Sequence, residues 1–80
     1  MKRGDMVRVN TSRVVEKFRD STRTYLYEDE MCWKHTGSLT SREIATVMET
    51  VLLRGNHVVR ILKGSGETGW CYASWLEVVP

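Results

Sequence analysis

This sequence of 80 residues has little cysteine, little proline and no long hydrophobic run. Two cysteines are too few for the disulfide framework of a small secreted domain, so we expect reduced thiols. No apolar stretch approaches the roughly 20 residues of a membrane-spanning helix, and no apolar segment of a signal peptide follows Met1-Lys2-Arg3. We therefore expect one domain, residues 1–80, without a membrane partner and in the cytoplasm of the cell that makes it.

Neither sign of charge is in large excess. Twelve Lys and Arg residues face ten Asp and Glu residues, which gives a net charge of +2 and a pI of about 8.7. The apolar fraction is 41%, with three Trp and three Tyr, and the single Pro is the last residue. This balance argues against disorder and favours a small folded core.

The two ends of the chain carry the clearest strand patterns. Residues 4–9 read as a turn followed by a short strand, with Val7 and Val9 on one face. Near the other end, Gly64, Gly66 and Gly69 predict turn conformations before an aromatic strand. That strand places Trp70 and Tyr72 on one face and Cys71 on the other. A short polar turn and an alternating apolar strand then close the chain, as in a small β-barrel.

Residues 41–53 support two interpretations. A capping box from Thr40 to Glu43 and apolar residues at helical spacing favour a helix over 41–53, and hence an α+β fold. The many β-branched residues favour a strand instead. Gly55-Asn56 suits the centre of a hairpin turn, and residues 57–63 are plainly a strand. The hairpin of 43–53 with 57–63 is preferred because it agrees with both ends of the chain.

Residues 10–40 are predicted to form a long, partly irregular loop. Val14, Val15 and Phe18 have the spacing of one buried face, basic residues are interspersed with them, and the acidic run 28–30 comes after. The preferred interpretation is a solvated loop whose charges pair with each other; the alternative is an insertion that carries the binding surface, as long loops in small domains often do.

The residues from Gly66 to Val78 resemble the last third of an SH3 fold. There a glycine-rich turn leads into an aromatic strand, a one-turn 3₁₀ helix of small residues and an aliphatic last strand. Residues 4–9 similarly resemble the opening strand of bacterial SH3-like and KOW-type barrels. The nearest overall likeness is to very small SH3-fold proteins of tailed phages. This resemblance implies a mostly β, five-stranded SH3-like barrel, in host cytoplasm or in the virion.

The departures from that family limit what the resemblance implies. The opening tyrosine motif of signalling SH3 domains is absent, and Arg42-Glu43-Ile44-Ala45 lacks the glycine pair of a KOW motif. Neither polyproline binding nor ribosome or polymerase binding follows from it. Only Trp70 and Tyr72, with Ala73 and Ser74, match positions near the usual SH3 groove.

A non-catalytic module that binds another protein is the preferred function. Trp, Tyr and Arg are the side chains most enriched at interface hot spots, and any of these aromatic residues can instead fill the core. The candidate binding residues are Tyr25, Tyr27, Trp33, Trp70, Tyr72, Trp75, Arg13, Lys17, Arg19 and Arg23.

Two other functions remain open. The basic residues of the N-terminal third could contact nucleic acid, although the pI lies below the value of about 9 typical of phosphate-binding domains. A virion or assembly component is the other alternative, because exposed strand edges let copies associate.

We expect neither an enzyme nor a bound cofactor. The glycines at 64, 66 and 69 lead into a strand rather than a helix, so they do not form a phosphate-binding loop. Metal binding has only weak candidates, Cys32 and His35 at ligand spacing with His57 and Cys71 far away in sequence.

Overall fold

A computed structural model describes residues 1–10 and 23–80 of the chain. The described part is mostly β and contains no α-helix. Its strands are β1 (Met6–Val9), β2 (Arg23–Tyr27), β3 (His35–Thr40), β4 (Ala45–Leu53), β5 (Asn56–Lys63), β6 (Thr68–Tyr72) and β7 (Leu76–Val78). A 3₁₀ helix, η2 (Ala73–Trp75), lies between the last two strands.

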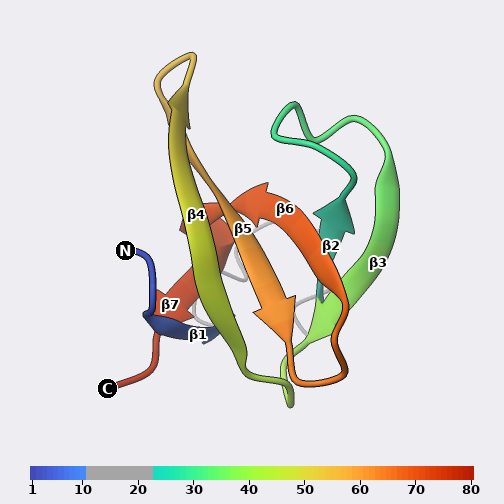
Figure 1. The fold of residues 1–80 in the computed structure, drawn as a ribbon, viewed down its shortest axis with the longest axis vertical. Coiled ribbons are helices and arrows are strands. Elements are labelled where there is room, and N and C mark those ends of the chain that lie inside the picture. Colours follow the sequence, from blue (N-terminus) through green and yellow to red (C-terminus); the bar gives the residue numbers. More distant parts are fainter. Residues whose placement is uncertain (11–22) are drawn as a thin grey trace.

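All seven strands belong to one antiparallel sheet in the order β3-β2-β6-β5-β4-β1-β7. Figure 1 shows that this sheet curls into a half-barrel, with the β4–β5 hairpin projecting at one end. The curl brings β1, near one end of the sheet, into contact with β3 at the other end. The chain termini, by contrast, lie together at the β1–β7 side (Figure 1).

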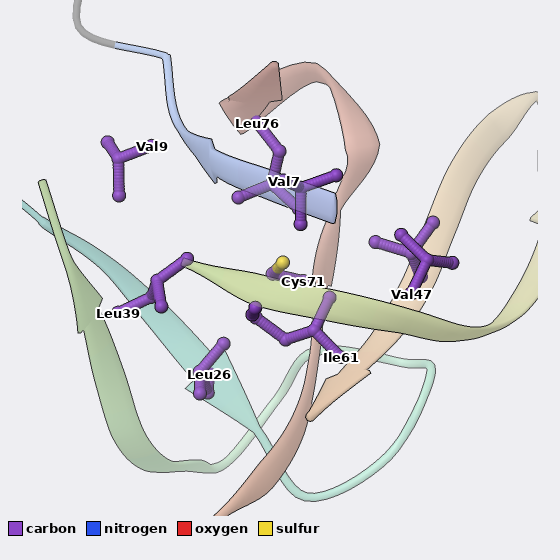
Figure 2. Close-up of a cluster of buried hydrophobic side chains, with 10 residues drawn as sticks. Val7, Val9, Leu26, Leu39, Val47, Ile61, Cys71 and Leu76 are labelled. Carbon is purple, nitrogen blue, oxygen red and sulfur yellow. The ribbon is translucent and has the colours of Figure 1, made fainter. Parts of the chain in front are cut away.

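The hydrophobic core fills the concave side of the sheet (Figure 2). Val7 and Val9 from the first strand meet Leu76 from the last, with Val9 directly opposite Leu76 in the ladder. Cys71 and Ile61 lie between them and Leu26 (Figure 2). The predicted joining of the two chain ends by apolar side chains is therefore confirmed. The full core set is Val7, Val9, Leu26, Leu39, Ala45, Val47, Val59, Ile61, Cys71 and Leu76.

Five strands were predicted and residues 1–10 and 23–80 contain seven, because the segment predicted as an irregular loop at 10–40 contains a hairpin. Strands β2 and β3 pair with each other, and β2 is joined to β6 through Tyr27 and Trp70. Thr24 and Leu26 alternate into the interior, which is the burial pattern of a strand. Residues 14, 15 and 18, for which a buried face was predicted, lie outside the described residues.

The hairpin interpretation of residues 43–63 is confirmed and the helix over 41–53 is wrong. Strands β4 and β5 pair along their whole length, with a bulge at Met48. The turn differs by one residue from the prediction: Leu53 faces Asn56, so the two central residues are Arg54 and Gly55. Both have positive φ, 51° and 81°, as a type I′ turn requires.

The closing segment follows the predicted order of strand, 3₁₀ helix and strand, and the half-barrel is compatible with an SH3-like barrel. One glycine departs from its prediction. Gly69 is predicted in a turn, yet it is a buried residue inside β6. It is needed there because a Cβ at this position would lie 2.5 Å from the Cβ of Leu26.

Candidate functional site

The loop between β2 and β3 forms one wall of the candidate site. It is closed by backbone hydrogen bonds from Glu28 N to Lys34 O (2.9 Å) and from Cys32 N to Asp29 O (3.1 Å). The Asp29 side chain adds a third, because its Oδ1 accepts from Met31 N at 3.0 Å. Such a turn, closed by an aspartate side chain, holds the loop in one shape.

The β4–β5 turn forms the opposite wall. Its residue Arg54 adopts a left-handed conformation, with φ of 51°, that costs a side-chain-bearing residue free energy. In the described chain the only other residue besides glycine with positive φ is Cys32, at 56° in the facing loop. Backbone strain therefore occurs in both walls, and strain of this kind clusters at functional sites.

Between these walls lies an open pocket of about 210 Å³. Val58 and Tyr72, which face each other across β5 and β6, contribute to its lining. Val58 is only 1% exposed although it lies outside the core cluster, so the outer face of the sheet is covered at this point. The lining residues are Glu30, Met31, Trp33, Leu53, Arg54, Asn56, Val58 and Tyr72.

Trp33 is the most exposed large apolar side chain of the described residues, with 82% of its surface accessible. It belongs to the pocket lining, just beyond the acidic run Glu28-Asp29-Glu30, whose three residues are all exposed. An indole left in water at the rim of a pocket is an arrangement that a bound partner would bury.

An aromatic cluster continues from the pocket through Tyr72. The Tyr72 ring packs edge-on against Trp75 with centroids 4.8 Å apart, and Tyr27 lies 6.4 Å from Trp75. All three are half-buried, so each keeps part of its ring accessible. Burial raises the pKa of Tyr27 above its ordinary value.

The predicted binding residues therefore divide into groups. Trp33 and Tyr72 line the pocket, and Tyr27 and Trp75 extend it as the cluster above. Trp70 is half-buried on the outer face, in register with Tyr27.

Tyr25 and Arg23 form a separate contact further along β2. The Arg23 guanidinium carbon lies 5.4 Å from the Tyr25 ring centre, and His35 meets the same ring edge-on at 5.1 Å. Arg13, Lys17 and Arg19 lie outside the described residues.

The weak metal candidates are not gathered into a ligand set. Over residues 1–10 and 23–80 no group of three or more His, Cys, Asp or Glu side chains is placed to hold a metal ion. Cys71 is completely buried in the core, and this burial raises its pKa to about 12. Burial also raises the pKa of the Cys32 thiol, so neither cysteine favours the thiolate that binds metal.

Sequence reasoning missed most of the pocket lining, including Glu30, Leu53, Arg54 and Val58. Glu30 comes from the β2–β3 loop and the other three from the β4–β5 hairpin, more than 20 positions away in sequence, and the pairing of β2 with β6 joins the two hairpins in one sheet. The one local signal was the hairpin turn predicted with Gly55-Asn56 at its centre, one residue from the observed centre at Arg54-Gly55.

Comparison of the chain with family models, curated protein sequences and solved structures finds no match to any of them. In the described ranges no helix has the length and apolar character needed to cross a bilayer.

Proposed function

We propose that this protein is a non-catalytic binding module that holds an extended segment of another protein in the pocket between residues 28–34 and 53–56. The observation that carries the proposal is Trp33, an indole 82% exposed beside a concave site that already contains Tyr72. Buried Trp and Tyr anchors contribute most of the binding free energy at protein interfaces.

The charge of the rim favours a partner segment that carries basic side chains. The loop that carries Trp33 exposes three carboxylates, Glu28, Asp29 and Glu30, and one cation, Lys34, while the described pocket lining holds one residue of each sign, Glu30 and Arg54. A cationic side chain could then meet a carboxylate and the face of an indole together, and both contacts are favourable.

Nucleic acid is a weaker fit. Three cations of the described chain are engaged by carboxylates: Arg8 by Glu77, Arg60 by Glu49, and Lys63 by Glu43 and Glu67. Phosphate contacts at these three positions would have to displace the ion pairs.

A phage origin would place the partner among host or phage proteins. The supporting features are the SH3-like order of strand, 3₁₀ helix and strand and the resemblance of the chain ends. The protein would then act in the host cytoplasm or on the virion.

The test compares proteins captured from host lysate by the wild type and by Trp33→Ala. Because Trp33 is exposed, its removal leaves the fold intact, and capture of the true partner should fall at least about tenfold. Tyr25→Ala, at another exposed aromatic residue, is the matched control and should capture as the wild type does. Equal capture by the wild type and Trp33→Ala contradicts the proposed site.

A further inference from the structure

A second surface lies on the outer face of β1, β4 and β5, apart from the pocket. Met6, Thr46 and Leu62 are direct neighbours across these three strands. Met6 is 50% exposed, and Leu62 is half-buried. We call this row of three residues the central row.

An ion pair flanks the central row on each side. On one side Arg8 Nε lies 2.7 Å from Glu77 Oε1, in register across β1 and β7. Arg8 faces outward because it alternates with the buried Val7 and Val9.

On the other side of the central row, Arg60 Nη2 lies 2.6 Å from Glu49 Oε1, in register across β5 and β4. Arg60 also faces outward, because its neighbours Val59 and Ile61 are both in the core. The surface thus has two apolar side chains, Met6 and Leu62, on either side of Thr46, and this row lies between two neutral charge pairs.

The order of these charges is self-complementary. Across the strands β7, β1, β4 and β5 the charged residues follow as Glu77, Arg8, Glu49 and Arg60, which alternate in sign. Glu77 and Arg8 lie on one side of the central row, and Glu49 and Arg60 lie on the other side. Arg8 is two residues along its strand from Met6, and Arg60 is two residues from Leu62, a distance of about 7 Å in each case.

A two-fold axis along the central row would exchange these two sides between copies. Glu77 and Arg8 of the second copy would then lie beside Glu49 and Arg60 of the first, in one line of alternating charge. The two-fold axis generates a second, identical line of charges on the other side of the central row. At the centre, Met6 of one copy meets Met6 of the other, and Leu62 meets Leu62. We infer that this outer face pairs with the same face of a second copy of the chain to form a two-fold dimer. The inference does not depend on the proposed function, because no pocket residue takes part.

Charge-swapped variants test this inference directly. Arg8→Glu with Glu77→Arg keeps an ion pair within the chain but places the new carboxylate at position 8 of one copy beside Glu49 of the other. Glu49→Arg with Arg60→Glu likewise keeps an ion pair within the chain but places the new cation at position 49 of one copy beside Arg8 of the other. Sedimentation velocity over a concentration series should show that the wild type dimerises, and that each swap lowers the association constant about tenfold or more.

An equimolar mixture of the two swapped variants should recover a dimer that contains one copy of each. One line of charges then consists of four unchanged residues and the other of four swapped residues, so both lines alternate in sign. A loss of stability cannot produce that recovery. A wild type that stays monomeric, swaps that dimerise like the wild type, or a mixture that stays monomeric each overturns the inference. If a swapped variant fails to fold, Met6→Lys at its half-exposed position should likewise weaken wild-type dimerisation, and dimerisation unchanged by it overturns the inference.

Discussion

Gly69 in β6 lies directly against Leu26 in β2, so close that a Cβ at position 69 would stand 2.5 Å from the Leu26 Cβ. This contact brings the β2–β3 hairpin against the rest of the half-barrel, and it also brings residues 28–34 to the pocket. The absence of a side chain at 69 therefore allows β2 to lie this close to β6.

Gly69→Ala should lower the free energy of unfolding by about 1–3 kcal/mol, because overpacking displaces Leu26 and the strand that carries it. Gly64→Ala is the matched control, since nothing lies within 4 Å of its added Cβ and its backbone is not left-handed. Urea denaturation of both variants measures the difference. Equal stability of the two would show that the approach of β2 to β6 is not as close as described.

Lys63 joins three segments of the fold through one ammonium group. Its side chain is 10% exposed, and its Nζ lies 2.9 Å from Glu43 Oε2, 2.9 Å from Ser38 O and 3.5 Å from Glu67 Oε2. Lys63→Met should cost about 1–3 kcal/mol, because it leaves these acceptors without their donor. Arg42→Met, at an exposed position, is the comparison and should change the stability by less than about 0.5 kcal/mol in the same urea experiment.

The same contact predicts an acid-sensitive step in stability. The hydrogen bond from Lys63 lowers the pKa of Glu43 below its usual 4.5. The contact between ionised Glu43 and Lys63 therefore stabilises the fold fully at a pH above the unfolded-state pKa of Glu43, about 4.5. This stabilisation is lost as the pH falls through the lower folded-state pKa. Thermal melting from pH 7 to pH 3 should show a smaller acid loss in Glu43→Gln than in the wild type. If the melting temperatures of the wild type and Glu43→Gln fall by the same amount between pH 7 and pH 3, Glu43 is not the group that causes the acid loss.

The left-handed conformation of Arg54 makes the β4–β5 turn sensitive to the residue type. Arg54→Asn should raise the unfolding free energy by a few tenths of a kcal/mol, since Asn-Gly is the preferred type I′ pair. Arg54→Val should lower it by about 1 kcal/mol or more, because a β-branched residue resists positive φ. If both variants unfold alike, the turn is not of the assigned type.

The two cysteines should differ in reactivity. Cys71 is buried and its pKa is raised to about 12, whereas Cys32 is half-buried in the β2–β3 loop. A thiol reagent at pH 8 should therefore modify one thiol per folded chain, more slowly than after denaturation because burial also raises the pKa of Cys32, and it should modify none in folded Cys32→Ser. Modification of Cys71 in the folded protein would contradict its place in the core.

The ends of the chain and the β4–β5 hairpin could be predicted from sequence because local patterns agree with the tertiary structure there. Trp70 and Tyr72 face outward while Cys71 faces the core, as the alternation predicted. The β2–β3 hairpin was missed for a physical reason. Only Leu39 is fully buried in β3, and Gly37 and the polar residues around it give no alternating apolar pattern.

Local hydrogen bonding also explains the competing helix prediction. The backbone N–H of Thr40 does donate to Glu43 Oε1 at 3.1 Å, which is half of a capping box. Here the bond closes the β3–β4 turn, and Glu43 is drawn to Lys63 instead of starting a helix. The β-branched residues that follow then pair with β5, so the sheet outweighs the local helix signal.

In the proposed complex, residues 28–34 and 53–56 enclose the partner segment. The most direct measurement titrates the captured partner segment into ¹⁵N-labelled protein and follows the amide and indole signals. We predict that the largest changes fall on the indole N–H of Trp33 and on the amides of these two ranges. Changes confined to β1 and β7, with the Trp33 indole unmoved, would contradict the account.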